Sequence, residues 1–379
     1  MKYDVISADG HVDLIWLPPD LFTKNASAHL KDRMPHVVEG PKGPEWVSAK
    51  GAKFGLMNGM GSAGREYVPG IIHRSDRMAS TGLYEDGKKS IRRLTEVDLR
   101  LKDQDRDGVQ AEVLYGILGS SGRLNDPEAA LEMLRIYNDW LHEFCKGAPE
   151  RLVGLANIPN YNMEESVAEM MRNAKRGIRG FDVANRPDMV PLWDEHWEPL
   201  WKCAHETGIP VHFHTIGGRS PDVTKMPTHI QRRVFAVHIT GFQMHMSAML
   251  MGLIFSGAPE RYPNLKIVIG EAGLGWIPYV LQHMDLEWED QFKDLDLKMK
   301  PSEYWHRQFY ATYQTDPVGI ELLKHLGEDN VMWGSDFPHP DGIWPDSKEF
   351  IDRELGPLPA AVRQKVVRDN AAKLYRLGN

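Results

Sequence analysis

The sequence has few cysteines, no signal-peptide core and no long hydrophobic run. Only two of its 379 residues are cysteine, Cys145 and Cys203, which argues against a disulfide framework and favours a reducing, cytoplasmic setting. Residues 1–11 lack the apolar segment of a secretory signal. The most apolar stretch, Met246–Ile254, is far shorter than the ~20 residues that cross a bilayer. We therefore expect a soluble intracellular protein with no membrane partner.

Positive charge is also scarce. Lys and Arg total 45 against 53 for Asp and Glu, which gives a net charge of -8. No long basic run is present, so nucleic acid is not expected as a partner. Hydrophobic residues make up 42% of the chain and aromatic residues 9%, which is typical of a folded globular protein. The length suits two average domains or one α/β barrel, which alone needs roughly 250 residues.

Short apolar runs alternate with amphipathic, helix-like segments. The apolar runs are mostly continuous, as in strands that are buried on both faces of a parallel sheet. Repeated strand-then-helix units indicate an α/β fold and, at about eight repeats, a closed (β/α)8 barrel. The predicted strands are Tyr3–Ala8, Ala111–Tyr115, Leu152–Ala156, Gly180–Val183, Pro210–Phe213, Lys266–Gly270, Phe309–Thr312 and Val331–Gly334. The predicted helices are Pro127–Lys146, Met163–Lys175, Leu192–Thr207, Val234–Phe255, Trp276–Phe292, Gly319–Leu326 and Leu358–Leu377.

The segment Trp16–Ser90 does not fit this repeat. It is rich in Gly, Pro and Met and has little periodicity. A long insertion after the first strand of a barrel lies at the carboxyl ends of the strands, so we interpret residues 16–90 as a cover over the active-site mouth, with a partner contact as the alternative. No linker separates a second domain, and residues 1–379 are predicted to form one domain.

Five polar residues lie at or just past the ends of predicted strands. In a barrel these ends converge on one face, where active sites are built. One such residue is explained by the start of a turn, but five in register favour a site. They are Asp9, Asn157, His214, Glu271 and Asp336.

Two of these residues have a histidine two positions away. Asp9 is followed by His11, and His214 is preceded by His212. Residues two apart on an extended strand point to the same face. Carboxylate oxygens and imidazole nitrogens are ligands for zinc or manganese. A lone strand histidine is more often a core residue, whereas a pair at the end of a buried strand makes a ligand function equally plausible.

The remaining strand-end motifs carry carboxylates. Asp336 follows a buried apolar strand, where an unpaired carboxylate is costly unless it is paired, bound to a metal or raised in pKa. His339, in the turn that follows, contacts substrate or caps the turn. Glu271 lies in a Gly-rich segment ending at Trp276, which lacks the lysine of a phosphate loop. A catalytic or ligand-orienting role for Glu271 is therefore preferred, and His238 is a further histidine within reach of the mouth.

With these motifs in place, the sequence resembles the amidohydrolase-related family, and within it the branch of aminocarboxymuconate-semialdehyde decarboxylase and the resorcylate-type decarboxylases. The resemblance covers nearly all of the chain outside Trp16–Ser90. The matching landmarks are Asp9-Gly10-His11, Gln104-Asp105-Arg106-Asp107-Gly108-Val109, Ala148-Pro149-Glu150-Arg151-Leu152-Val153-Gly154, Ile158-Pro159, Gly208-Ile209-Pro210-Val211-His212-Phe213-His214, Ser256-Gly257-Ala258-Pro259-Glu260-Arg261-Tyr262-Pro263-Asn264-Leu265-Lys266 and Gly334-Ser335-Asp336-Phe337-Pro338-His339.

The resemblance implies one divalent metal ion, zinc or alternatively manganese, and a homodimer. The implied metal ligands are Asp9, His11, His214 and Asp336, with Asp336 also acting as a base. The chain departs from the family at Glu271, where the family commonly has a histidine that handles protons. Asp9 likewise stands where the family has His or Glu.

The function expected from this resemblance is the non-oxidative decarboxylation of a small aromatic or unsaturated carboxylic acid. Two alternatives stay open: a hydrolase that uses metal-bound water on an amide, ester or carbon–carbon bond, and a catalytically idle barrel that acts as a binding protein. The residues assigned to catalysis are Asp336, Glu271 and His238. Those assigned to substrate contact are His212, His339 and Trp276.

Overall fold

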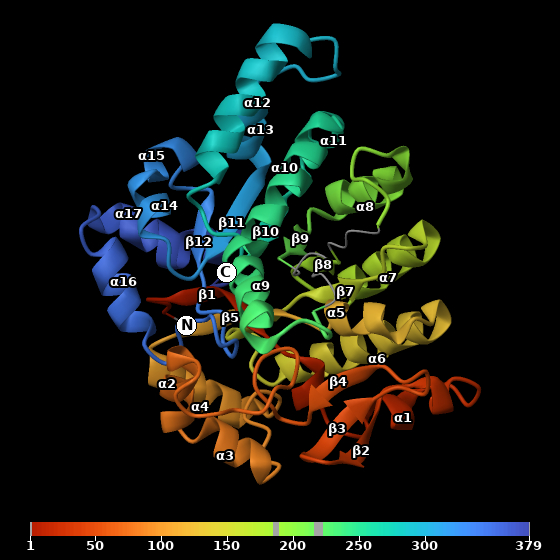
Figure 1. The fold of residues 1–379 in the computed structure, drawn as a ribbon. Helices are drawn as coiled ribbons and strands as arrows, with labels where there is room; N and C mark the ends of the chain where they lie inside the picture. The colour runs from red at the N-terminus through yellow and green to blue at the C-terminus, as the bar shows by residue number, and fades with distance from the viewer. Residues whose placement is uncertain (1, 185–188, 216–222, 379) are drawn as a thin grey trace.

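Parallel strands form the centre of the fold, and helices surround them (Figure 1). The computed structural model describes residues 2–184, 189–215 and 223–378. Within these residues the barrel strands are β1 (Ile6–His11), β5 (Ala111–Tyr115), β6 (Leu152–Gly154), β7 (Ala156–Ile158), β8 (Phe181–Val183), β9 (Val211–His214), β10 (Ile267–Gly270), β11 (Phe309–Tyr313) and β12 (Val331–Trp333). Each matches a predicted strand in place, although β1 extends three residues further than predicted and so includes the Asp-Gly-His motif.

The strands follow one another in chain order around the barrel. One sheet has the order β1-β5-β6 and the other β12-β11-β10-β9-β8-β7, with every neighbouring pair parallel. β6 and β7 are two halves of one strand, which pair with β5 and β8 respectively on either side of Leu155. β12 and β1 meet through the residues that follow β12: the Asp336 N–H donates to the Asp9 carbonyl at 2.9 Å, and the His11 N–H donates to the Phe337 carbonyl at 2.8 Å. The predicted (β/α)8 fold is confirmed.

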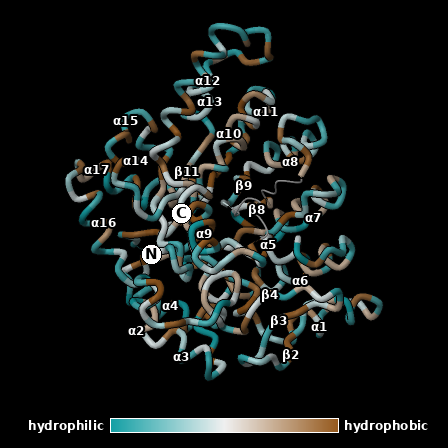
Figure 2. The backbone as a smooth tube through the Cα atoms, viewed as in Figure 1, coloured by the Kyte–Doolittle hydropathy of each residue, from teal (hydrophilic) through white to brown (hydrophobic). Residues whose placement is uncertain are grey.

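The helices confirm the amphipathic pattern in most places. α6 (Pro127–Lys146) and α7 (Met163–Lys175) have the predicted bounds. Asp126 caps α6 by accepting from the Ala129 N–H, with Pro127 in the first turn, and Asn162 caps α7 in the same manner. Along these helices hydrophobic and hydrophilic residues alternate (Figure 2), which leaves one face of each helix for the core.

Several of the remaining predicted helices are divided into shorter helices in the structure, and other helices of the structure were not predicted. Short helices with few periodic apolar positions, such as α13 (Pro301–Gln308) and α16 (Ser347–Leu355), are not among those predicted. The structure has α4 (Val97–Asp107), α5 (Leu118–Ser121), η3 (Gly122–Leu124), η4 (Glu195–Trp197), α8 (Glu198–Thr207), α11 (Ala258–Arg261), α12 (Ile277–Gln291), α13 (Pro301–Gln308), α14 (Pro317–Glu321), α15 (Leu323–Leu326), α16 (Ser347–Leu355), α17 (Ala360–Gln364), η6 (Lys365–Asp369) and α18 (Asn370–Leu374).

One continuous helical run is unusually exposed. It comprises α9 (Thr228–Gly241), η5 (Phe242–His245) and α10 (Met246–Phe255). No residue of α9 is buried, whereas α10 buries six residues against the core. By length and composition the whole run, Thr228–Phe255, is long and apolar enough to cross a membrane. An 18-residue stretch of it has mean hydropathy 1.2, and 17% of that stretch is buried inside the protein. The expectation based on Met246–Ile254 alone missed this run, because it ignored the helical residues that precede that stretch.

The insertion after β1 has regular structure that its sequence did not predict. It contains η1 (Leu14–Trp16), α1 (Leu21–Asn25), η2 (Lys31–Arg33), β2 (His36–Gly40), β3 (Gly43–Val47), β4 (Lys53–Leu56), α2 (His73–Ser80) and α3 (Leu83–Lys88), and its three strands form an antiparallel sheet. Trp46 of this sheet is fully buried beside Phe22. The insertion also contacts the segment after β12, through an ion pair between Arg77 and Asp346 and a hydrogen bond from Arg74 to the Asp341 carbonyl.

Candidate metal centre at the carboxyl ends of the strands

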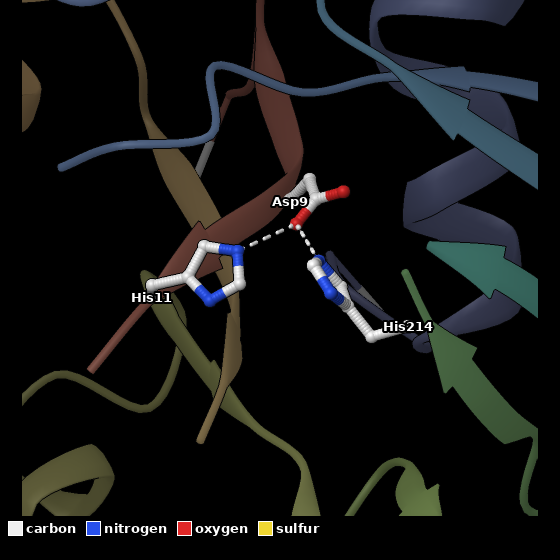
Figure 3. Close-up of side chains that lie close together, drawn as sticks. All are labelled: Asp9, His11 and His214. Atoms are coloured by element: carbon white, nitrogen blue, oxygen red, sulfur yellow. Dashed lines mark ion pairs between the residues drawn. The ribbon is translucent and has the colours of Figure 1, made fainter. Parts of the chain in front are cut away.

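Four predicted ligands from three distant segments lie close together, in two groups that share His11: Asp9, His11 and His214 form one, and His11, Asp336 and His339 form the other. Asp9 and His11 are on β1, His214 ends β9, and Asp336 follows β12. His11 Nε2 lies 3.3 Å from Asp9 Oδ1 and 3.1 Å from Asp336 Oδ1, while His214 Nε2 lies 3.4 Å from Asp9 Oδ1 (Figure 3). Ligands bound at about 2.1 Å in a tetrahedral site are separated by about 3.4 Å. The spacing of these atoms therefore fits a shared metal ion.

The same four side chains carry buried atoms that have no hydrogen-bond partner. These atoms are Asp9 Oδ1, His11 Nε2, His214 Nε2 and both carboxylate oxygens of Asp336. Buried polar atoms are nearly always satisfied in proteins, and each exception needs an explanation. A divalent cation supplies a partner for oxygen and nitrogen lone pairs alike. The donor set consists of two carboxylates and two imidazoles, so the residues fit the ion that the sequence implies.

Neighbouring groups fix which atom of each ligand faces the centre. His214 Nδ1 lies 3.0 Å from the Thr215 carbonyl, an acceptor that places the proton on Nδ1 and leaves the Nε2 lone pair free. Asp9 Oδ2 accepts hydrogen bonds from Thr312 Oγ1 at 2.6 Å and from the Glu271 N–H at 2.9 Å, so Oδ1 is the remaining oxygen. Thr312 was not singled out from the sequence, because a threonine inside an apolar strand gives no distinct signal.

A buried ion pair between Arg100 and Glu112 contacts the end of β1. Arg100 Nη1 donates to the His11 carbonyl at 2.8 Å, and Arg100 Nε lies 2.8 Å from Glu112 Oε2. A Cβ at Gly10 would come within 3.3 Å of the Arg100 guanidinium, which explains why glycine separates the two ligands. Arg100 and Glu112 were also missed, because no helix was predicted around Arg100 and a charged residue on a strand, such as Glu112, is usually solvated.

His339 contacts Asp336 and Asp13, and Asp13 was not identified from the sequence. Its Nδ1 lies 3.0 Å from Asp336 Oδ1, its Nε2 lies 3.2 Å from Asp13 Oδ2, and its ring stacks on His11 with centroids 3.9 Å apart. Asp13 is 5% exposed. Its position two residues after His11 repeats the Asp9–His11 spacing, and that alternation is the signal that would have found it.

Glu271 lies beside the four ligands without sharing their immediate contacts. Its Oε2 is 3.7 Å from His214 Nε2, and a carboxylate oxygen of Glu271 lies within 4.8 Å of one from Asp336 and one from Asp341. Glu271 and Asp336 both have left-handed backbone conformations, with φ of 49° and 57°. Such angles are uncommon outside glycine and gather at functional sites. Asp341, in the turn after His339, was not assigned a role from the sequence.

The charges of the centre separate its carboxylates into two kinds. Burial alone raises the pKa of Asp9 and of Asp336, but His214 and His11 lower the pKa of Asp9, and His339 and His11 lower that of Asp336 to about 2. Burial raises the pKa of Glu271 well above its usual value, and the neighbouring Asp336 and Asp341 raise it further. The surroundings therefore favour the ionised form of Asp9 and Asp336 and disfavour the ionised form of Glu271.

Four other predicted residues, His212, His238, Trp276 and Asn157, do not contact these ligands in the described structure. His212 is fully buried one strand layer below His214, where its Nδ1 contacts the Tyr115 hydroxyl at 3.0 Å and its ring stacks on Tyr375. His212 is packed inside the barrel, and its assignment to substrate contact stays a prediction. His238 lies on exposed α9, and in the described residues no hydrogen bond or ion pair joins it to the centre.

Trp276 and Asn157 do not contact the four ligands in the described structure, and Asn157 is buried within β7 in register with Asp182. Trp276 precedes α12, and its indole N–H donates to the Ala272 carbonyl at 2.7 Å. Its assignment to substrate contact stays a prediction. Asn157 instead bridges neighbouring strands: Oδ1 accepts from the Ile117 N–H at 2.8 Å, and Nδ2 lies 3.3 Å from Asp182 Oδ2.

A cavity of about 360 Å³ occupies the same face of the barrel. It lies over the carboxyl ends of β5, β7 and β8, which fall between β1 and β9 in the order of the strands. Most of its lining is apolar. The residues that line it are Leu118, Ser121, Gly122, Asn125, Asp126, Pro127, Ala130, Leu134, Ile158, Pro159, Asn160, Tyr161, Ala184, Met189 and Val190.

The family model described as amidohydrolase matches residues 93–377 of the chain. The chain belongs to the amidohydrolase family. A gamma-resorcylate decarboxylase from Rhodococcus jostii is 25% identical over 302 residues, which cover 74% of the chain and 87% of that relative.

Two solved structures extend this similarity to the fold. The 5-carboxyvanillate decarboxylase from Sphingomonas paucimobilis has a TM-score of 0.68 at 22% identity, covering 99% of the chain and all of that structure (100%). The dihydroxybenzoic acid decarboxylase from Polaromonas sp. JS666, solved with bound manganese and the inhibitor 2-nitroresorcinol, has a TM-score of 0.63 at 22% identity, covering 80% of the chain and 93% of that structure. The family and the decarboxylase branch expected from the sequence are confirmed.

Proposed function

We propose that this protein is a metal-dependent, non-oxidative decarboxylase of a small aromatic carboxylic acid. The observation that carries the proposal is the convergence of four ligand side chains, from β1, β9 and the segment after β12, whose unpartnered buried atoms lie 3.1–3.4 Å apart. The similarity to decarboxylases of resorcylate and carboxyvanillate supports the choice of reaction.

In this proposal Asp9, His11, His214 and Asp336 hold one divalent ion. When bound, such an ion supplies a Lewis acid that attracts a substrate carboxylate and an adjacent oxygen. Zinc is our first candidate and manganese the alternative, since both accept carboxylate and imidazole ligands. The bound manganese of the Polaromonas relative supports the alternative. Metal analysis of the purified protein, followed by reconstitution with each ion, distinguishes the two.

Glu271 is the proposed proton donor. Burial and two neighbouring carboxylates, Asp336 and Asp341, raise its pKa well above the usual value, which favours the acid form that a proton donor needs. In the reaction the Glu271 O–H bond breaks and its proton forms a C–H bond at the ring carbon that bears the carboxylate. The bond from that carbon to the carboxylate then breaks, its electron pair returns to the ring, and carbon dioxide leaves. Glu271 recovers a proton from solvent.

His339 orients this chemistry, and the insertion shields it. His339 contacts Asp336 and Asp13 and stacks on His11, which places an imidazole edge beside the proposed substrate position. The segment 16–90 contacts the turn after β12 through Arg74 and the carbonyl of Asp341. This contact supports the proposal that the insertion covers the mouth and limits the entry of water.

Carbon dioxide release tests the function. The metal-loaded protein is incubated with 2,6-dihydroxybenzoate, 5-carboxyvanillate and matched aromatic amides and esters. We expect carbon dioxide from the acids and, in deuterium oxide, one deuterium at the vacated ring carbon. Hydrolysis of the amides or esters without carbon dioxide would instead establish the metal-water hydrolase. Less than about one-tenth equivalent of metal, not recovered on reconstitution, would establish a catalytically idle barrel.

The chain is further proposed to form a homodimer through α9 in a cytoplasmic setting. α9 is apolar yet has no buried residue, and Phe235 and Val237 are 50% and 76% exposed. An exposed apolar surface of this kind marks an interaction site. The net charge of -8 disfavours an anionic membrane as its partner, and two free thiols, Cys145 and Cys203, suit a reducing compartment. Light scattering on the wild type and on a Phe235→Ser, Val237→Ser variant tests the dimer, and co-sedimentation with vesicles would identify a membrane surface instead.

A further inference from the structure

The cavity over β5, β7 and β8 has the position of a substrate subsite but not the chemistry of a carboxylate site. The metal centre uses β1, β9 and the segment after β12, so the cavity occupies the arc of the barrel rim between two of its ligand strands. Its innermost lining is set by the strands themselves. Ile158 is the last residue of β7, and Ala184 directly follows β8; both are buried, at 0% and 5% exposure.

The cavity extends from this rim to the molecular surface. Tyr161, which lines its outer part, is 46% exposed, and Pro127 and Asn125 are also exposed. Its volume of about 360 Å³ falls within the range of small-molecule pockets. A ligand whose carboxylate lies at the metal centre therefore has a second space available on the same barrel face, open toward solvent.

Three polar side chains of the lining, Ser121, Asn160 and Tyr161, donate hydrogen bonds within the protein. The Ser121 hydroxyl donates to the Leu118 carbonyl at 2.9 Å, Asn160 Nδ2 donates to the Ala184 carbonyl at 2.7 Å, and the Tyr161 hydroxyl donates to the Pro127 carbonyl at 2.9 Å. A polar ligand group would have to compete with these bonds.

Among the lining residues that the structure describes, the one charged side chain is neutralised and has the wrong sign for an anion. Asp126 accepts two hydrogen bonds from Arg33, at 2.6 and 3.0 Å, and lies 3.3 Å from Lys50 Nζ. Among the described lining residues there is no Lys, Arg or His. The side chains that remain for contact are aliphatic, including Leu118, Ala130 and Leu134. An uncharged apolar group is therefore the favoured occupant.

We propose that this cavity binds an apolar substituent of the substrate, so that the preferred substrate is an aromatic carboxylic acid carrying an alkyl or aryl group rather than an unsubstituted hydroxybenzoate. The proposal rests on the proposed decarboxylase function for the position of the carboxylate. The apolar contact itself does not depend on the metal ion.

Ala130 offers a variant that fills the cavity. It lies on α6, lines the cavity and is 6% exposed, so Ala130→Phe places a ring in the space. Ala130→Leu is a smaller change that serves if the phenylalanine variant does not fold. The matched control is Ala361→Phe on α17, which adds the same ring to an exposed helix outside the cavity lining.

The first measurement uses metal-free protein, so that it does not depend on catalysis. Binding of 4-butylphenol, which has no carboxylate, is measured by calorimetry or thermal shift. We expect saturable binding to the wild type and to Ala361→Phe, with a loss of at least tenfold in affinity for Ala130→Phe or Ala130→Leu. Equal affinity for all folded variants, or no binding to the wild type, would overturn the proposal.

The second measurement uses the metal-loaded enzyme with 2-hydroxybenzoates that carry hydrogen, methyl, butyl or phenyl at each ring position in turn. We expect kcat/KM for the best substituted acid to exceed that of the unsubstituted acid by at least tenfold, mainly through KM, and the Ala130 variants to lose this ratio. A ratio near one that no variant changes would contradict the proposal. If 4-butylphenol binds the cavity but no acid is decarboxylated, the proposed function fails while the apolar site stands.

Discussion

Two histidines on one strand, two residues apart and on the same face, have opposite environments. His214 lies at the rim of the barrel, where its Nε2 is near Asp9 and Glu271 and has no hydrogen-bond partner. His212 lies one layer deeper and fully buried, with its Nδ1 beside the Tyr115 hydroxyl, its ring against Tyr375 and its Nε2 also without a hydrogen-bond partner. Burial lowers the pKa of His212 to about 3, so it stays neutral. The periodicity of a strand determines the face on which a side chain lies, whereas its depth in the barrel determines whether it reaches the chemistry.

The aspartates of the two layers differ in the same way. At the rim the imidazoles of His11 and His339 lower the pKa of Asp336 to about 2. In the deeper layer burial raises the pKa of Asp182 to about 7, despite the opposing effect of His214 and His11. Desolvation affects both residues, and direct contact with imidazole decides which of them ionises.

The strongest test of this comparison replaces each histidine in turn. His214→Ala removes one of four proposed ligands, so we expect metal content below one-tenth of the wild type and activity reduced by about 10³-fold or more. His212→Phe preserves the ring volume and is expected to retain the metal, with a loss of about 1–3 kcal/mol in stability because the Tyr115 hydroxyl loses its partner. Metal analysis and chemical denaturation of both proteins are the measurements. Loss of metal in His212→Phe with retention in His214→Ala would reverse the assignment of the two layers.

A smaller effect is expected at Glu271, which is at the rim but outside the four ligands. Glu271→Gln keeps the shape and removes the acidic proton, so turnover is predicted to fall about 10²- to 10⁴-fold while the metal stays bound. Glu271→Asp is the matched variant, and partial recovery of turnover is expected because it restores an acidic group. Unchanged turnover in Glu271→Gln would give this residue a structural role only.

Asp13→Asn is expected to have a moderate effect through His339. The carboxylate of Asp13 holds His339 Nε2 at 3.2 Å, and its charge raises the pKa of that imidazole. We predict a roughly tenfold fall in kcat, the lower end of what a single orienting contact contributes, together with a shift in the pH profile and unchanged metal content. A fall in folded yield with an unchanged pH profile would indicate that Asp13 acts on stability alone.

The smallest expected effect concerns the stability of the deeper layer. The folded pKa of Asp182, about 7, exceeds its unfolded value, so the folded state binds more protons between about pH 4 and pH 7. Stability of the metal-free protein should therefore fall as the pH rises through this range and level off above it. Asp182→Asn should flatten this slope, which thermal melts at pH 5, 6, 7 and 8 would reveal. An identical slope in the variant would place the titrating group elsewhere.

The sequence predicted the strands and the rim well because both depend on local pattern. Apolar runs ending in Asp9, His214 or Asp336 are recognisable wherever strands are buried on both faces. The position of His212 below the barrel mouth was not predictable in this way. Alternation along a strand shows which face a side chain is on but not how far from the mouth it lies. Asp13 was within reach of the pattern, as it continues the alternation of Asp9 and His11.

Other features depend on contacts that no local pattern carries. The antiparallel sheet of the insertion is interrupted by Gly and Pro, so its strands show little alternation before Trp46 is placed in its core. The apolar residues of α9 predict a buried helix, whereas α9 has no buried residue. Hydrophobicity alone indicates that a helix face is buried but does not identify the surface that covers it.

The hydrogen bonds that link Asp9 and His11 to Asp336 and Phe337 have a consequence for synthesis on the ribosome. β1 ends at His11 and β12 begins at Val331, so a nascent chain lacks the proposed ligand Asp336 until the last strand of the barrel has been translated. If the proposed ligands hold an ion, a ribosome stalled before position 336 should present a chain that binds the ion only weakly.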